Sequence, residues 1–282
     1  MAFSLNNILP PRFRKDITVI PVLRLSGAIG SASPLRTGLS LAGLEKALAK
    51  AFSVARAPAV AIIVNSPGGA AVQSHLIHQR IRALATEKKK HVIVAVEDVA
   101  ASGGYMIAVA GDEIIVDPSS IVGSIGVVSA GFGFEQLIRK IGVERRVHTA
   151  GNSKAMLDPF RPEKAEDVAR LKAMQEDVHA MFIALVKGRR PQLAADPDLF
   201  SGAFWSGARA VELGLADRVG DLRSVLKERY GERLRVVDVP TERNTLRKRL
   251  GMSAAAEGVA AGLVREAAAT VEERALWARY GL

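Results

Sequence analysis

The stretch HVIVAVEDVAASGGYMIAVAG, residues 91–111, carries the clearest indication of the fold. After His91, residues 92–96 form a continuous apolar run rich in valine, which is typical of a strand buried on both faces of a parallel sheet. Gly103 and Gly104 then mark a turn, and the apolar residues that follow them predict a helix. Because a buried strand that leads directly into a helix is half of a βαβ unit, this stretch predicts an α/β fold.

The same order of strand, glycine-rich turn and helix occurs immediately upstream. AVAIIV (residues 59–64) predicts a second buried strand, SPGG (66–69) a turn, and residues 71–87 a helix. Before them, residues 17–25 predict a first strand, and residues 39–52 predict a helix with leucines on one face. Repeated βαβ units form parallel sheets, in which ligands bind beyond the carboxyl ends of the strands. The SPGG and ASGG turns fall at that edge.

Downstream of residue 111 the chain continues with shorter elements. We expect strands over residues 113–116, 126–129, 143–149 and 234–239, and helices over residues 134–141, 162–190, 207–213 and 222–230. The chain then divides into a basic leader (residues 1–16), a main α/β domain (17–240) and a mainly helical C-terminal extension (241–282). A solvated helix is the simplest interpretation of this extension, and docking on a neighbouring subunit or at an active site stays open.

The composition limits the chemistry that the chain can carry out. Its 282 residues include no cysteine, which excludes disulfides, thiolate metal sites and a cysteine nucleophile. His75 and His78 share a helix face, but without further ligands we expect surface or oligomer-contact roles rather than a metal site. The net charge is +10, yet Lys and Arg are scattered without interleaved aromatic residues, so we expect no nucleic-acid partner. The basic segments 8–15 and 243–249 leave two interpretations open, peripheral contact with an anionic membrane or a solvated basic surface.

The N-terminal segment lacks the pattern of an export signal. Asn6 and Asn7 interrupt its apolar residues, and Pro10 and Pro11 end them before the first basic residue. No run elsewhere approaches the roughly 18 apolar residues that cross a bilayer. We therefore expect a cytoplasmic protein that contacts membranes, if at all, only at their surface.

Ser102 is the first candidate for chemistry, because it stands where a buried strand turns into a helix. The amides of Gly103 and Gly104, at the start of that helix, would stabilise negative charge on a carbonyl oxygen attacked by the serine. Serine is also a preferred helix N-cap, and for SGG taken alone this structural role is the commoner one. The SPGG turn taken alone is likewise an ordinary turn.

Five motifs that follow one another along the chain include these two turns. They are NSPGG (65–69), ASGGY (101–105), SIG (124–126), GNSKAMLDPFRP (151–162) and WSGARAVELGLAD (205–217). With these motifs the chain resembles the signal peptide peptidase A family of serine peptidases over about residues 17–225. The resemblance implies an α/β core of the ClpP/crotonase type, assembly of copies into a ring, and hydrolysis of apolar peptides such as remnant signal peptides. It implies neither a cofactor nor a metal.

The resemblance also implies roles for individual residues. Ser102 matches the nucleophile, Lys154 the general base, and Ser124 the residue that orients the lysine. Gly69 matches an oxyanion-hole glycine, and the amide of Gly103 is a second donor. We expect a peptide substrate to add as a strand beside this glycine-rich turn through backbone hydrogen bonds. The expected substrate-binding residues are Gly68, Ala70, Ala71 and Val72.

A lysine base places a demand on its surroundings. Lysine accepts a proton near neutral pH only where an apolar pocket removes its charge and no carboxylate pairs with it. Asp158 lies four residues after Lys154 and is therefore expected to point elsewhere. No histidine occurs between Ser102 and Arg146, which argues against a Ser-His-Asp site.

Two other functions stay open. An acyl-CoA enzyme of the crotonase group uses a similar pair of amides for a thioester oxyanion and does not require Lys154. A non-catalytic scaffold of the same fold would bind peptides without cutting them. Loss of activity in a Lys154 variant would separate the peptidase from the first, and covalent labelling of Ser102 would separate it from the second.

Overall fold

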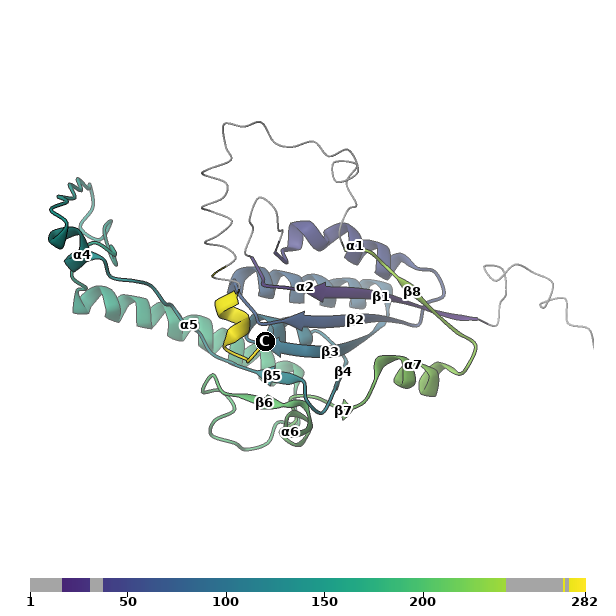
Figure 1. Ribbon diagram of the computed structural model, residues 1–282. Helices are drawn as coiled ribbons and strands as arrows, with labels where there is room; N and C mark the ends of the chain where they lie inside the picture. The colour runs from purple at the N-terminus through teal and green to yellow at the C-terminus, as the bar shows by residue number, and fades with distance from the viewer. Residues whose placement is uncertain (1–16, 31–37, 242–270, 272–273) are drawn as a thin grey trace, which may run out of the picture.

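The structure, a computed structural model, describes residues 17–30, 38–241, 271 and 274–282. Within these residues one sheet of eight strands forms the centre of the molecule (Figure 1). The leader expected over residues 1–16 and residues 242–270 of the expected extension lie outside the described part of the chain.

The strands are β1 (Thr18–Ser26), β2 (Ala59–Ser66), β3 (His91–Ala101), β4 (Glu113–Val116), β5 (Ile121–Gly123), β6 (Phe204–Ser206), β7 (Arg218–Val219) and β8 (Leu234–Asp238). The helices are α1 (Leu41–Ser53), α2 (Ala71–Lys88), α3 (Gly103–Ala108), α4 (Glu135–Lys140), α5 (Ala165–Arg189), α6 (Gly207–Glu212) and α7 (Leu222–Tyr230). Among the described helices, none combines the length and apolar character that a membrane span requires.

The sheet is almost entirely parallel. Its strand order is β6–β5–β3–β2–β1–β8, with β4 beside β3 and β7 beside β4, and only β5 and β6 run antiparallel. Parallel neighbours need crossover connections, which α1 and α2 supply between the first three strands. The α/β fold with repeated βαβ units, expected from the sequence, is confirmed. The strand expected over residues 234–239 is also confirmed, as β8 at one edge of the sheet.

Successive residues of the central strands face different helices. On one face, Leu23 and Val94 pack with α1, α2 and α3 in the largest apolar cluster of the described chain. On the other face, Ile20 and Ile93 pack against α7. Each fully buried side chain of this size contributes roughly 1.5–3 kcal/mol relative to an exposed one. The result is a rigid sheet whose carboxyl edge can hold turns in fixed positions.

Two expected strands are wrong. Residues 126–129 and 143–149 form neither strand nor helix. A strand needs a neighbour that takes up its backbone hydrogen bonds, and residues 143–149 lie on an exposed extension without such a neighbour. The short strands β5, β6 and β7 take part in the sheet instead, and no local sequence pattern predicted them.

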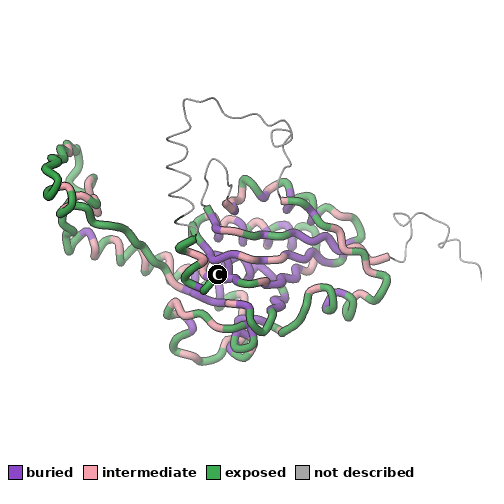
Figure 2. The backbone as a smooth tube through the Cα atoms, in the orientation of Figure 1, coloured by how far each residue is buried: buried purple, intermediate pink, exposed green. Residues whose placement is uncertain are grey.

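Residues 127–164 form an extension, here called the arm, that leads away from the sheet and returns into α5 (Figure 1). Most of its residues are exposed (Figure 2). The Phe134 N–H donates a hydrogen bond to the Pro159 carbonyl at 2.6 Å, and the rings of Phe134 and Phe160 lie 5.5 Å apart between centroids. These contacts give the arm a defined shape without burying it on the sheet.

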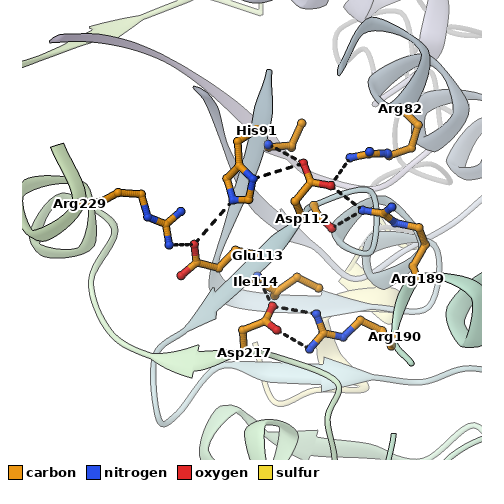
Figure 3. Close-up of polar contacts among 11 residues, drawn as sticks. Arg82, His91, Asp112, Glu113, Ile114, Arg189, Arg190, Asp217 and Arg229 are labelled. Atoms are coloured by element: carbon orange, nitrogen blue, oxygen red, sulfur yellow. Dashed lines mark hydrogen bonds and ion pairs between the residues drawn. The ribbon is translucent and has the colours of Figure 1, made fainter. Parts of the chain in front are cut away.

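A network of ion pairs holds the far end of α5 (Figure 3). Arg189, the last residue of α5, donates to two backbone carbonyls and to Asp112, the latter at 3.0 Å. Arg82 of α2 also donates to Asp112, at 2.8 Å, and the Val92 N–H of β3 donates to it at 2.9 Å. One carboxylate thus joins α2, α5 and the sheet. The C-terminal end of α5 is fixed, while its N-terminal end carries the arm.

Candidate active site

The carboxyl ends of β2, β3 and β5 meet at one edge of the sheet. Ser66 of β2 pairs with Ala100 of β3, and Ala101 of β3 pairs with Gly123 of β5. The two glycine-rich turns and the SIG motif therefore leave adjacent strands at the same edge. This is the edge at which open α/β sheets bind their ligands.

Ser102 has a backbone conformation that serine rarely adopts, with φ 52° and ψ −121°. It occupies the N-cap position of α3, but its side chain accepts no capping hydrogen bond. Its N–H donates to the Gly123 carbonyl at 2.8 Å, which holds the turn in place. Such conformations cost about 1–3 kcal/mol and cluster at functional sites. Helix capping, the structural alternative for this serine, is not what the side chain does.

The turn at Gly68 and Gly69 packs directly against Ser102. A β-carbon on Gly68 would lie 2.9 Å from the Ser102 β-carbon and 2.8 Å from the Ala101 carbonyl oxygen, so glycine is required there. The Gly69 N–H has no hydrogen-bond partner among the described residues. The Gly103 N–H, the first of α3, has none within its helix. Two amides that can stabilise an oxyanion are thus available beside the Ser102 turn.

Ser74 is a residue of this region that sequence reasoning missed. It is fully buried in α2, and its hydroxyl donates to the Ala70 carbonyl at 2.9 Å. A β-carbon on Gly103 would collide with this hydroxyl, so Ser74 explains why residue 103 is glycine. The signal was a polar residue on the same helix face as Ile77 and Ile81, both fully buried.

The segment available for pairing with a substrate strand is shorter than expected. Ala71 and Val72 form the first turn of α2, so they are helical rather than extended, because the helix begins directly after Ala70. The Ala70 N–H donates to the Ile29 carbonyl at 2.9 Å, and the Gly68 carbonyl accepts from the Ile29 N–H at 2.8 Å. One edge of residues 68–70 is therefore occupied. The N–H and carbonyl of Gly69 face the other side, since neighbouring residues of extended chain alternate.

Ser124 lies beside the nucleophile turn, directly after β5. It is buried with φ 54°, and its N–H donates to the Ala203 carbonyl at 2.7 Å. Its hydroxyl accepts a hydrogen bond from the Tyr280 hydroxyl at 3.3 Å. Sequence reasoning left open that the C-terminal extension reaches an active site, but it did not single out Tyr280, because nothing in the pattern of the last residues relates them to the SIG motif.

Within one chain the structure does not bring Lys154 to Ser102. Lys154 is exposed in a turn of the arm, where its N–H donates to the Gly151 carbonyl at 3.2 Å. The described side-chain hydrogen bonds of the arm join its residues to one another or to α5. The serine with its glycine turns and the lysine thus belong to separate parts of the molecule.

Asp158 is engaged by partners other than Lys154. It accepts a hydrogen bond from the Phe160 N–H at 3.0 Å and forms ion pairs with Arg145 and Arg161. The hydrogen bond from Phe160, together with the two guanidinium groups, lowers the pKa of Asp158. Its negative charge is therefore held by these neighbours.

The interpretation of His78 as a surface or oligomer-contact residue is wrong. His78 is buried between α2 and α3, with its Nδ1 atom 2.9 Å from the Met106 carbonyl oxygen. Burial lowers the pKa of His78 to about 4. The pattern misled because helix α2 is covered on the face that carries this histidine. His75 is partly exposed, and no cluster of metal-ligating side chains occurs within the described ranges.

Comparison with known proteins places these features in a family. A model of "Peptidase family S49" matches residues 84–233, which include Ser102, Ser124 and Lys154. The chain belongs to peptidase family S49. The expected relationship to signal peptide peptidase A is confirmed, since a relative of this S49 chain from Enterococcus faecium is named putative signal peptide peptidase SppA. The two are 32% identical over 57% of this chain and 47% of that protein.

Another relative of the S49 chain is much longer. A Brucella abortus protein named Na(+)/H(+) antiporter NhaA is 56% identical over 99% of this chain. The chain spans 39% of that protein's length, and the antiporter name describes the larger protein. Among solved structures, the 1510-N membrane-bound stomatin-specific protease is 18% identical, with a TM-score of 0.45 over 80% of this chain and 95% of that one.

Proposed function

We propose that this S49 chain is a serine endopeptidase module that cleaves extended, mainly apolar peptides, including remnant signal peptides. The observation that supports this most is the state of Ser102. Its backbone is strained, its side chain caps nothing, and the amides of Gly69 and Gly103 beside its turn have no hydrogen-bond acceptor in the part of the chain that the structure describes. A nucleophile next to an oxyanion hole requires this combination.

In the proposed reaction, uncharged Lys154 removes the proton from the Ser102 hydroxyl, and the oxygen attacks the peptide carbonyl carbon. The amides of Gly69 and Gly103 stabilise the negative charge on the carbonyl oxygen. The carbon–nitrogen bond breaks as Lys154 returns the proton to the leaving amine. Water then hydrolyses the resulting ester, with the lysine again as base, and Ser102 is regenerated.

The lysine in this scheme comes from a second copy of the chain, because the arm carries Lys154 away from its own Ser102. The arm also carries large apolar side chains that are exposed to solvent in the single chain. They are Val127, Val128, Phe132, Phe134, Leu137, Ile141, Val143 and Met156. Burial of this surface against a neighbour would exclude water and create the apolar surroundings that a lysine base requires. Repetition of the contact from copy to copy gives the ring that we propose.

Replacement of the nucleophile tests the peptidase proposal. In the Ser102→Ala variant, turnover of a fluorogenic apolar peptide should fall to background, since no other described hydroxyl takes this position. The Ser119→Ala variant changes an exposed serine of another turn and should retain full activity. Unchanged turnover in Ser102→Ala would end the proposal.

Complementation tests the shared site. A mixture of Ser102→Ala chains and Lys154→Ala chains should recover activity, because some neighbours then combine an intact serine with an intact lysine. Random 1:1 mixing of closed rings predicts about a quarter of the wild-type rate. A mixture that stays inactive would assign both residues to one chain. Activity of Lys154→Ala alone would favour the acyl-CoA enzyme.

A further inference from the structure

The last residues of the chain fold back onto the carboxyl edge of the sheet (Figure 1). Residues 274–278 are helical, and Tyr280 behind them is 8% exposed. Tyr280 and Trp277 pack against the end of β3 and against β5, in a small apolar cluster that is separate from the main core. The cluster contains Ala101, which directly precedes Ser102. This terminal segment, residues 274–282, is called the tail below.

Tyr280 is the main contact of the tail. Its ring meets Phe204 edge to face, with centroids 5.1 Å apart and an interplanar angle of 73°. Its hydroxyl donates to the Ser124 hydroxyl oxygen at 3.3 Å. Ser124 is buried beneath this contact, so the phenol fills the space from which another side chain would approach the serine. A tyrosine buried in this way has both an apolar contact and a partner for its hydroxyl.

The tail is attached by few side chains. Trp277 and Leu276 are half-buried, while Arg274, Ala278, Arg279 and Leu282 are exposed. A segment anchored mainly by two aromatic residues can leave and return without unfolding of the sheet, because local openings have their own, lower free energies. Opening of the contact with Ser124 should therefore need less free energy than unfolding of the core.

We infer that the tail is an autoinhibitory plug, in which Tyr280 occupies the place beside Ser124 that the lysine of a second copy must enter. This inference rests on the function proposed above, in which Ser124 orients that lysine. While the tail is docked, the amine cannot reach the Ser124 hydroxyl and the dyad with Ser102 does not form. When the tail leaves, the apolar surface of Val99, Ala101 and Ile121 becomes free for the arm of the neighbour.

Point variants of the full chain test the plug. Tyr280→Ala should raise both the initial rate of peptide cleavage and the rate at which a fluorophosphonate labels Ser102, each by about tenfold or more, since the competent fraction of molecules increases. Tyr280→Phe keeps the ring and removes only the hydroxyl, so a smaller increase is expected. Arg279→Ala changes an exposed neighbour and should leave both rates unchanged.

Fluorescence reports docking independently of activity. The chain has two tryptophans, so a Trp205→Phe background leaves Trp277 as the only emitter. Tyr280→Ala should shift its emission to longer wavelength as the indole enters water. An unchanged or lowered cleavage rate in Tyr280→Ala, despite this shift, overturns the plug and identifies the tail as a structural cover.

The two proposals fail in different ways. If cleavage depends on Ser102 but is not increased by Tyr280→Ala, the inference alone is wrong. If the Tyr280→Ala, Ser102→Ala double variant still cleaves peptide, the proposed nucleophile is wrong. Absence of Ser102-dependent cleavage and labelling in both wild type and Tyr280→Ala overturns both.

Discussion

At the scale of single residues, glycines of similar conformation differ in what a side chain would meet. Gly68 and Gly27 have φ values of +100° and +109°. A β-carbon on Gly68 would press against Ser102 and Ala101, whereas one on Gly27 would meet no atom within 4 Å. The two positions therefore share the backbone cost of a side chain, and only Gly68 adds a steric effect on the nucleophile.

This pair of glycines gives the first prediction. Gly68→Ala should lower kcat/KM by about 100-fold or more, because a misplacement of the order of 1 Å at the reacting atoms has an effect of this size. Gly27→Ala should lose about 1–2 kcal/mol of stability through its left-handed backbone while it keeps most activity. Peptide cleavage and thermal unfolding of both variants are the measurements. Equal activity losses in the two variants would contradict a specific contact with Ser102.

Residues could be predicted where a local motif specifies them. Ser102, Gly68 and Gly69 stand in short motifs at the ends of apolar runs, and the structure brings these turns together. Tyr280 could not be predicted, since its contact with Ser124 joins positions far apart in the sequence. The approach of such pairs depends on the whole fold and leaves no trace in local spacing.

At the scale of elements, helix α2 packs against α3 and contacts it through a buried histidine. His78 of α2 contacts the Met106 carbonyl within α3, in a buried position that keeps the imidazole uncharged. With Nδ1 protonated, the ring donates this hydrogen bond. Because α3 begins at the residue after Ser102, the contact helps to fix the orientation of the nucleophile turn.

The titration of His78 predicts how stability changes with pH. Its pKa is about 4 in the folded chain, against about 6.5 for an unfolded histidine, so only the unfolded state gains a proton between these values. The free energy of unfolding therefore keeps the full contribution of neutral His78 above pH 6.5. As the pH falls toward 4, it decreases by up to about 3 kcal/mol. Urea unfolding across this range should show the decrease, and His78→Asn should reduce it.

A histidine of the arm provides the control for the pH dependence attributed to His78. His148→Asn changes an exposed histidine and should leave the pH dependence of the free energy of unfolding as in the wild type. A His78→Asn curve as steep as the wild-type curve would show that another group is responsible.

Asp112, which binds the C-terminal end of α5, gives a prediction for the edge of the sheet opposite the candidate active site. Burial disfavours the charge of Asp112, but the hydrogen bonds from the Val92 N–H and from Arg189, with the nearby Arg82, outweigh it and lower the pKa of Asp112. Asp112→Asn leaves two guanidinium groups without their carboxylate and should cost about 2–4 kcal/mol in urea unfolding. Glu228→Gln removes an exposed partner of Arg218, so its effect on the free energy of unfolding should be much smaller. Similar losses in both variants would contradict a special role for Asp112.

The sequence predicted elements well where burial determines them. β2, α1 and α2 follow apolar runs and periodicities and agree with expectation to within two residues at each end, whereas β3 continues five residues beyond its expected end at Val96. The strand expected over residues 143–149 failed because this segment lies on the exposed arm, where no neighbouring strand takes up its backbone hydrogen bonds. A local pattern does not show whether a partner strand will be available.

At the scale of the whole molecule, the proposed nucleophile and the proposed general base lie on different parts of the chain. The sheet holds Ser102 in place, and the arm carries Lys154 at the other end of α5 from its anchor at Arg189 (Figure 1). The exposed apolar residues of the arm are what a contact between copies would bury. Assembly and catalysis are therefore coupled in the proposed function.

A substitution on the arm tests this coupling. Phe132 is 81% exposed, so Phe132→Ser should leave the melting temperature of the single chain unchanged while it shifts sedimentation velocity toward smaller species. Peptide cleavage should fall in parallel. Val219→Ser, on the 42% exposed residue of β7, should change neither quantity. An unchanged size distribution in Phe132→Ser would remove the arm from the interface.

The position of the arm has a consequence for newly made protein. If the hydroxyl and the amine that activates it come from different chains, a chain that has just left the ribosome carries only halves of two sites. The rate of peptide cleavage per chain then depends on the protein concentration, and dilution stops cleavage without any chemical change to the chain. Folding and proteolytic activity would then be separated in time, and a folded chain without neighbours would leave peptides intact.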